Sequence, residues 1–297
     1  MIRGTAVQGQ PMTAGITYDL AEEYRAQGYD EEQVAELDSE ETVAAIEGAL
    51  RSLGYVTERI GNLMSLTRRV AGCRTWDIVF NIAEGVRGMG RESAVPALLD
   101  AVGVPYTFSD PAVHALTLHK AMAKRVLRDC GVPTAPFAEA RNPGELEAVS
   151  LAFPLFVKPV AEGTGKGIGP GSLVSDRGAL VAYGEDLLRR FGQPVLVERY
   201  LPGREFTVGL LGTGANAEAP AVMEVVFLEE AESAAYTFHN KKHYRSTVSY
   251  RLAEGEDADS CRSVALRAWQ LLGCRDGGRV DVRMDEHGEP NIMEINT

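Results

Sequence analysis

The C-terminal stretch RVDVRMDEHGEPNIMEINT, from Arg279 to Thr297, brings together residue types that can do chemistry. Its pattern predicts two short strands joined by a turn over residues 285–288. With that turn, Asp281 is expected opposite Ile292. Side chains alternate between the faces of a strand, so one face is expected to carry Arg279, Asp281, Arg283, Ile292, Glu294 and Asn296. The other face is apolar and consists of Val280, Val282, Met284, Met293 and Ile295.

Two carboxylates, an amide and two guanidiniums on one face are the groups that a divalent cation and a phosphate require. Oxygen ligands suit Mg²⁺, which keeps several waters and takes further ligands from substrate phosphates. A solvated amphipathic hairpin would show the same alternation. This stretch alone therefore leaves both interpretations open.

Composition narrows the class of protein. The 297 residues suffice for two or three domains, and 45% of them are apolar. The net charge of −12 argues against a nucleic-acid partner. No apolar run is long enough to span a membrane, no signal peptide is visible, and residues 1–12 read as a disordered lead. The four cysteines form no CxxC pair, which indicates reduced thiols and a cytoplasmic protein.

The first hundred residues are expected to form a doubly wound α/β domain, in which ligands gather beyond the strand ends. Strands are predicted over residues 15–20, 55–60, 76–83 and 105–108. Helices are predicted after Ser39 and over residues 94–102. The Gly-rich segment GVRGMGRES follows the third strand.

The middle of the chain begins with a helix expected from Pro111 to the stop at Gly131 and Pro133. Its basic residues Lys120, Lys124, Arg125 and Arg128 fit a solvated stripe, Lys120 least of all. Lys158 then lies in an apolar strand, where an ammonium is costly without an anionic partner. The loop after it has glycine at positions 163, 165, 167, 169 and 171, and can turn N–H groups toward phosphate oxygens or act as a lid.

The last third contains the segment VLVERYLPGREFTVGLLG, read as strand, turn and strand. Glu198 and Glu205 could bond an adenine amino group and a ribose, or could be surface acids flanking a hairpin. His239 and His243 lack a third ligand nearby, which argues against zinc. A helix over residues 260–272 leads into the terminal hairpin.

Taken in order, these segments resemble the ATP-grasp superfamily and, within it, the D-alanine–D-alanine ligase family. The resemblance runs from Gly15 to the end of the chain. It is carried by FNIAEG, VPYTFSDPAVHALTLHKAMAKRVLRDCGVPT, FVKPVAEGTGKGIG, VERYLPGREFTVGLLG and RVDVRMDEHGEPNIMEINT. It implies an α/β (α+β) multi-domain protein: a Rossmann-like domain over residues 1–108, and an ATP-grasp fold with subdomains over residues 109–194 and 195–297.

The resemblance also assigns roles by position. Lys120 and Lys158 are similar to the two nucleotide-phosphate lysines, and Thr164 lies in the loop that covers the phosphates. Glu198, Arg199 and Leu201 match the adenine edge, and Glu205 the ribose partner. Lys241 resembles the lid lysine that reaches the γ-phosphate, and Arg279 the arginine that steadies an oxyanion. Asp281, Glu294 and Asn296 match the ligands of two Mg²⁺ ions, with Mn²⁺ as an alternative metal.

The implied reaction joins a small-molecule carboxylate to an amine, at the expense of ATP and through an acylphosphate. An ATP-binding module without turnover and a carboxylate kinase are the alternatives, and a homodimer is compatible with the family. The first-substrate glutamate stays open among Glu36, Glu40 and Glu41. The chain ends before a Gly-containing segment that in the family completes the second-substrate pocket. Four cations that could favour a more acidic substrate than D-alanine are Arg87, Arg91, Lys242 and Arg283.

Overall fold

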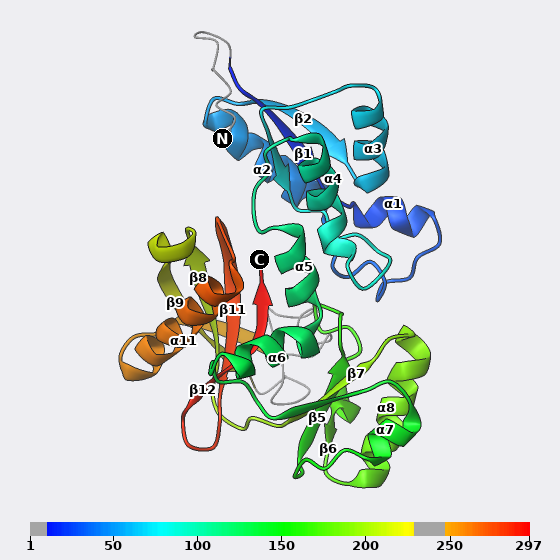
Figure 1. Ribbon diagram of the computed structural model, residues 1–297, viewed down its shortest axis with the longest axis vertical. Helices are drawn as coiled ribbons and strands as arrows, with labels where there is room; N and C mark the ends of the chain where they lie inside the picture. Colours follow the sequence, from blue (N-terminus) through cyan, green and yellow to red (C-terminus); the bar gives the residue numbers. More distant parts are fainter. Residues whose placement is uncertain (1–10, 229–246) are drawn as a thin grey trace. The chain divides into compact units, whose positions relative to one another are not determined.

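The computed structural model describes residues 11–228 and 247–297. The chain divides into two compact units, the first ending at Thr107 and the second beginning at Phe108. Figure 1 labels the helices and strands of both units.

The first unit is a parallel sheet with helices on both faces. Its strands β1 (Thr13–Thr17), β2 (Val56–Gly61) and β3 (Ile78–Asn81) lie in the order β2-β1-β3. Its helices are α1 (Ala21–Ala26), α2 (Glu40–Ser52), α3 (Leu63–Ala71) and α4 (Ala94–Val102), with a short 3₁₀ turn η1 (Arg91–Ser93) before α4. Ile16 packs with Val43 of α2, and Val79 packs with Leu66 of α3 and Leu99 of α4. These are the two apolar layers of a doubly wound domain.

Local signals place several of these elements. The hydroxyl of Ser39 accepts a hydrogen bond from the N–H of Thr42, which caps α2 at the predicted residue. Helix α4 has the predicted bounds and ends at Gly103, whose φ of +70° suits a glycine. The strand expected over 105–108 is wrong: only Tyr106 bridges to Val79. The extended run stops there because Phe108 takes a φ of +73°.

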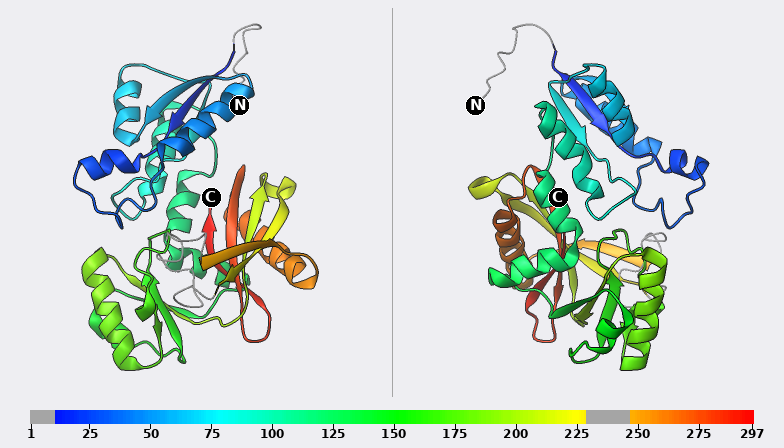
Figure 2. Two further views of the ribbon diagram at one scale, coloured as in Figure 1. Left: turned by 180° about the vertical axis from the view of Figure 1, so that it is seen from behind. Right: turned by 45° about the vertical axis from the view of Figure 1, so that its right-hand side comes forward.

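The second unit contains two antiparallel sheets, seen from two further directions in Figure 2. The four-stranded sheet has the order β4-β7-β5-β6: β4 (Phe137–Ala140), β7 (Val195–Arg199), β5 (Leu155–Pro159) and β6 (Leu173–Val174). Helices α7 (Pro143–Glu147) and α8 (Arg177–Phe191) pack against it, with η2 (Pro170–Ser172) before β6. Leu146, Leu155 and Leu180 are fully buried in the core between them.

The five-stranded sheet has the order β10-β9-β8-β11-β12. Its strands are β8 (Glu205–Leu211), β9 (Glu218–Phe227), β10 (Val248–Leu252), β11 (Gly277–Met284) and β12 (Pro290–Asn296), with η3 (Gly214–Asn216) between β8 and β9. Helix α11 (Glu256–Leu272) crosses β8, β9, β11 and β12 and begins four residues before the predicted start. Its Trp269 is fully buried and donates to the carbonyl of Gly212 at 3.1 Å, which fixes the helix on the sheet.

The helix expected from Pro111 onward is two helices, α5 (Pro111–Leu118) and α6 (Lys120–Asp129). The break is at His119, whose ψ of 85° is not helical and whose ring accepts from the N–H of Met122. A single helix was therefore a wrong prediction. The break puts Lys120 at the start of α6, where its N–H donates to the carbonyl of Val160 just beyond β5.

The segment VLVERYLPGREFTVGLLG is not a hairpin, because β7 and β8 belong to different sheets. Between them, the N–H of Gly203 donates to the carbonyl of Met284 at 3.0 Å. A Cβ at position 203 would lie 2.6 Å from that oxygen, so only glycine fits this close approach. Because the chain passes here from one sheet to the other, Glu198 and Glu205 lie inside the unit rather than on a surface turn. Only 5% of Glu198 and 6% of Glu205 is exposed.

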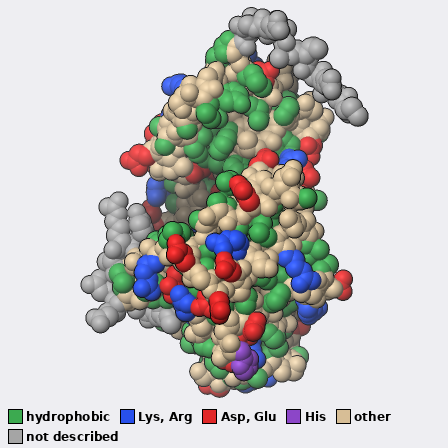
Figure 3. All heavy atoms as spheres, turned by 90° about the vertical axis from the view of Figure 1, so that its left-hand side faces the viewer, with side chains coloured by type: hydrophobic (Ala, Val, Ile, Leu, Met, Phe, Trp, Pro, Cys, Tyr) green, Lys and Arg blue, Asp and Glu red, His purple; other side chains and the backbone are tan. Residues whose placement is uncertain are grey.

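No helix in the described ranges is long and apolar enough to cross a membrane. Figure 3 shows acidic and basic side chains interspersed on the part of the second unit that faces the viewer. That mixture agrees with exposed ion pairs such as Arg204–Asp257 and Arg262–Asp259.

Candidate functional site

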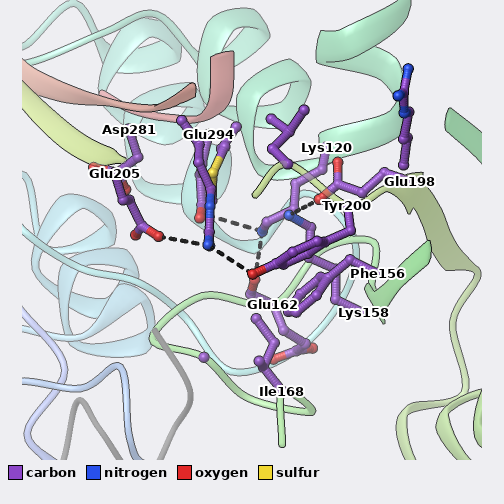
Figure 4. A pocket seen from close by; sticks show the side chains of 15 residues that line it. Lys120, Phe156, Lys158, Glu162, Ile168, Glu198, Tyr200, Glu205, Asp281 and Glu294 are labelled. Carbon is purple, nitrogen blue, oxygen red and sulfur yellow. Dashed lines mark hydrogen bonds and ion pairs between the residues drawn. The ribbon is translucent and has the colours of Figure 1, made fainter. Parts of the chain in front are cut away.

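A pocket of about 740 Å³, open to solvent at its mouth, lies within the second unit, and its lining comes from both sheets and from α6 (Figure 4). The lining residues are Lys120, Phe156, Lys158, Glu162, Gly165, Ile168, Glu198, Arg199, Tyr200, Leu201, Glu205, Asp281, Arg283, Met293 and Glu294.

The terminal hairpin exists, but its register differs from the prediction. Asp281 lies opposite Glu294, and Arg279 lies opposite Asn296. A bulge then shifts the pairing, so that Val282 is opposite Ile292 and Met293 is the extra residue. Ile292 therefore belongs to the apolar face, at 1% exposed, and Met293 lines the pocket. The predicted pairing of Asp281 with Ile292 was wrong for two reasons. The turn is one residue longer than predicted, since Met284 pairs with Pro290, and the bulge adds a second residue of shift.

The candidate metal ligands are neighbours on this hairpin. Asp281 accepts from the hydroxyl of Thr207 at 2.7 Å, and the amide of Asn296 lies 3.4 Å from its other oxygen. Arg279 is half-exposed, with its Nε 3.6 Å from Asp281, and does not line the pocket. In the described ranges, no three His, Cys, Asp or Glu side chains cluster as a metal site. Two carboxylates and an amide fit Mg²⁺, which completes its shell with water and phosphate.

Lys120 bridges the candidate metal ligand Glu294 and the Gly-rich loop. Its ammonium lies 2.9 Å from Glu294 and donates to the carbonyl of Glu162 at 2.5 Å. The side chain is only 4% exposed, although it begins a helix. A buried cation between a carboxylate and a loop carbonyl is suited to meet an anionic ligand that enters the pocket.

Lys158 has the anionic partner that its apolar strand requires. Glu198 lies 2.6 Å from the ammonium of Lys158 and 3.0 Å from that of Lys124, and all three side chains are less than 10% exposed. Burial by itself would raise the pKa of Glu198, but the two ammoniums outweigh it and lower that pKa to about 2. Burial lowers the pKa of Lys124, with Glu198 acting against it. The trio carries one net positive charge, which favours an anionic ligand.

The other end of the pocket holds a second buried ion pair. Arg283 donates to Glu205 at 3.1 Å and to the hydroxyl of Tyr200 at 3.1 Å. Its guanidinium also lies over the Tyr200 ring, 5.1 Å from the centroid. Figure 4 shows Glu205 on the side of the pocket opposite Lys158 and Glu198, with Tyr200 beside those two residues.

The Gly-rich loop contributes backbone more than side chains. Gly165 and Ile168 line the pocket, whereas Thr164 is partly buried beside it with a φ of +49°. Lys166 pairs with Glu162 of the same loop at 2.5 Å. Leu201 and Arg199 reach the lining from the end of β7. The expected lid lysine Lys241, with Lys242, His239 and His243, lies outside the described residues.

In the first unit, acidic side chains gather beyond the carboxyl ends of the strands. Glu36 pairs with Arg91 at 2.9 Å, and both are buried. Burial raises the pKa of the nearby Glu84 to about 9, with the charge of Glu92 adding to the effect. Arg91 and Arg283 are therefore each matched by a carboxylate. Two of the four cations that were expected to favour an acidic substrate are thus already paired with a carboxylate.

Four lining residues had no predicted side-chain role: Phe156, Glu162, Ile168 and Tyr200. Met293 was expected on the apolar face of the hairpin but lines the pocket. Lys124 was assigned to a solvated stripe, although it is 2% exposed. Its spacing four residues after Lys120 was the available signal, because residues i and i+4 share a helix face. No local sequence signal indicates that Tyr200 or Met293 lines the pocket. Tyr200 is there because the chain passes between the two sheets, and Met293 because of the bulge in the hairpin.

The family model described as the C-terminus of D-ala D-ala ligase matches residues 126–297, more than half of the chain. The chain belongs to the D-alanine–D-alanine ligase family. A family member from Bordetella avium, named D-alanine–D-alanine ligase, is 33% identical over 261 residues, which are 86% of this chain and 78% of that protein.

Two further relatives agree with this membership. An uncharacterised protein of Sinorhizobium fredii is 37% identical over 75% of this chain and 66% of its own length. The D-alanine–D-alanine ligase of Bordetella pertussis is 36% identical over 70% of this chain and 65% of its own length. The chain thus spans slightly less than two thirds of these two curated relatives.

Solved structures of the family show the fold. A Bacillus anthracis D-alanine–D-alanine ligase, solved in complex with ATP, superposes with a TM-score of 0.67 at 20% identity, over 96% of this chain and 86% of that chain. The VanG D-Ala:D-Ser ligase of Enterococcus faecalis gives 0.68 at 18% identity, over 97% and 90%. The α/β ATP-grasp fold predicted from the sequence is confirmed.

Proposed function

We propose that this protein is an ATP-dependent carboxylate–amine ligase that works through an acylphosphate. The observation that carries the proposal is the pocket of the second unit, which combines buried lysines with the carboxylates Asp281 and Glu294. These two residues and the adjoining Asn296 form the metal face of the hairpin. Membership of the D-alanine–D-alanine ligase family supports the same activity.

The nucleotide roles follow the charges of the pocket. Lys120 and Lys158 bind phosphate oxygens, since both ammoniums are buried beside carboxylates and line the pocket. Glu198 keeps Lys158 charged, because it holds that ammonium at 2.6 Å. The residues after it, Arg199 and Leu201, flank the adenine. Glu205 takes the ribose, and Thr164 belongs to the loop over the phosphates.

Mg²⁺ held by Asp281, Glu294 and Asn296 would neutralise the charge of the transferring phosphoryl group. Two ions are proposed, with Mn²⁺ as an alternative. The residues of the chain supply the rest. Lys120 and Lys158 align the triphosphate, Arg279 and Lys241 steady the developing charge, and the Gly-rich loop excludes water.

The reaction balances in two steps. A carboxylate oxygen of the first substrate attacks the γ-phosphorus, the bond to the β-phosphate oxygen breaks, and ADP leaves. The amine of the second substrate then attacks the acyl carbon, and phosphate leaves with the carboxyl oxygen while the nitrogen loses a proton. The substrates proposed are amino acids, with D-alanine a candidate because relatives carry the name D-alanine–D-alanine ligase. The proposed assembly is a homodimer in the cytoplasm.

A screen of amino-acid pairs for phosphate release, with Mg²⁺-ATP, tests the proposal. Turnover should require both a carboxylate and an amine. Positional isotope exchange in ATP should need only the carboxylate substrate, because without an amine the acylphosphate can return its phosphoryl group to ADP.

Two results would replace the proposal. Nucleotide binding without turnover for any pair would indicate an ATP-binding module. Accumulation of a phosphorylated carboxylate that no amine consumes would indicate a carboxylate kinase. Glu289→Gln, an exposed change in the turn of the same hairpin, is the control variant for all assays.

A further inference from the structure

The ion pair between Arg283 and Glu205 is an unusual lining for a small-molecule pocket. The two residues are direct cross-strand partners in β11 and β8, so their side chains lie on one face of the five-stranded sheet. Their side chains are 7% and 6% exposed. A buried ion pair gives little net stability compared with an apolar pair of similar size, so stability alone does not account for this one.

Arg283 also ties the two sheets together at this end of the pocket. Tyr200 follows β7 of the four-stranded sheet, and its N–H donates to the carbonyl of Pro154 at 3.1 Å. The guanidinium donates one Nη to Tyr200 and the other to Glu205, while lying over the tyrosine ring. A planar group fixed by two bonds and a ring contact has few orientations. The carboxylate that it holds is therefore also fixed.

The chemistry of that carboxylate decides what it can select. An ionised Glu205 can only accept hydrogen bonds, and a carboxylate offers roughly four acceptor directions. Its ligand must present donors, which excludes phosphate oxygens and suits the vicinal hydroxyls of a sugar. Lys158 and Glu198 line another part of the pocket, with Lys124 paired to Glu198, and this cationic trio suits phosphate instead.

We propose that Arg283 is a specificity-determining residue: by fixing Glu205 against Tyr200, it makes the pocket select ribonucleotides over 2′-deoxyribonucleotides. This inference rests on the proposed nucleotide-binding function. A hydroxyl donating to a rigid carboxylate forms a charge-assisted bond, whereas a carboxylate free to rotate loses part of that gain in ordering. Arg283 acts through Glu205, so its effect is on the choice of sugar more than on affinity as such.

The test compares ADP with 2′-deoxyADP by isothermal titration calorimetry of the full chain at saturating Mg²⁺. The wild type should bind ADP roughly 10-fold to 100-fold more tightly, the scale of one hydrogen bond to a charged group. In Arg283→Met this ratio should fall to about 3-fold or less. Arg283→Lys keeps the charge but cannot bridge both partners, so its ratio should fall nearly as far.

Two further variants separate this role from a structural one. Tyr200→Phe keeps the ion pair and removes one bond to the guanidinium, so an intermediate ratio is expected; this variant also serves if Arg283→Met does not fold. Arg204→Met loses ion pairs to Glu224 and Asp257, which lie outside the pocket lining, and should keep the wild-type ratio. A purely structural role for Arg283 would weaken both nucleotides equally.

Each outcome decides between the alternatives. A ratio that stays at the wild-type value in Arg283→Lys and Tyr200→Phe, even if both affinities drop, would overturn the inference and leave the proposed ligase activity standing. A wild type that binds ADP and 2′-deoxyADP equally would do the same. A wild type that binds neither nucleotide would overturn both proposals.

Discussion

At the scale of single residues, the second unit concentrates buried charge in matched sets. Lys120 is matched to Glu294, Lys124 and Lys158 share Glu198, and Arg283 is matched to Glu205. A buried charge persists only when it is paired or awaits a ligand. These sets are therefore where substitutions should separate binding from folding.

Glu294→Gln should lower Mg²⁺-dependent phosphate release by at least roughly 100-fold, the scale for losing a preorganised charge partner in the transition state. The amide is isosteric but removes the charge that faces the buried ammonium of Lys120, so the thermal midpoint should also fall. Rates from a coupled phosphate assay, compared with those of Glu289→Gln, provide the check. Turnover near the wild-type rate would remove Glu294 from the metal face.

Lys124→Met should cost about 3–5 kcal/mol of unfolding free energy, because it breaks a buried ion pair and leaves Glu198 with one cation fewer. Nucleotide affinity should also fall, because Glu198 is then neutralised by Lys158 alone and less positive charge remains for the phosphates. The control is Arg128→Met on the same helix, an exposed residue whose guanidinium lies over the Phe137 ring, 5.3 Å from its centroid; such an exposed contact is worth about 1 kcal/mol or less. Urea denaturation measures both, and equal effects would contradict the assignment.

Glu84→Gln should stabilise the protein at pH 8.5 and not at pH 5. Burial raises the pKa of Glu84 from 4.5 to about 9, so the folded state keeps a proton that the unfolded chain releases. Stability is then lost as pH rises from about 4.5 toward about 9. Glutamine is neutral throughout and removes this loss. Melting temperatures of Glu84→Gln at both pH values measure this effect, with the exposed Glu41→Gln as control. A higher melting temperature at pH 5 but not at pH 8.5 would contradict the prediction.

At the scale of elements, β11 and β12 are closely spaced where the metal face is built. A Cβ at Gly278 would lie 2.3 Å from the carbonyl oxygen of Asn296 and 2.7 Å from the ring of Trp269. Glycine here lets β11 approach both its neighbouring strand and α11. The position of Asn296 therefore depends on a residue that carries no side chain.

Gly278→Ala should push β12 away and lower both the thermal midpoint and Mg²⁺-ATP turnover, since overpacking a core site costs about 1–3 kcal/mol. Gly209→Ala is the matched control: it lies in β8 of the same sheet, and its Cβ would meet only the carbonyl of Ala221 at 3.9 Å. Calorimetry and the phosphate assay should separate the two variants. Equal tolerance of both would mean that β12 can relax without affecting the site.

At the scale of the whole molecule, every residue of the pocket belongs to the second unit. Mg²⁺-ADP should therefore slow hydrogen exchange in β5, β7, β8, β11 and β12, and leave β2 and α3 of the first unit nearly unchanged. At a ligand concentration of 100 times the dissociation constant, the stabilisation is about 2.7 kcal/mol. Exchange mass spectrometry with and without nucleotide measures this, and stronger protection in β2 than in β11 would contradict it.

The sequence by itself determined what depends on neighbours along the chain. The cap at Ser39, the bounds of α4 and the turn of the terminal hairpin follow from local hydrogen bonding and backbone preference, and the five ordered motifs indicated the ATP-grasp fold. The polar face with Asp281, Glu294 and Asn296 also followed, because alternation is a local property of strands.

Only the tertiary structure decided what depends on residues distant along the chain. The bulge after Asp281 moved Ile292 into the core and Met293 into the pocket, since a strand bends to suit the sheet it joins. The break at His119 and the passage of the chain between two sheets buried Lys124, Glu198 and Glu205. An exposed acid and a buried, paired one look alike in sequence, because burial is set by the elements that pack around a side chain.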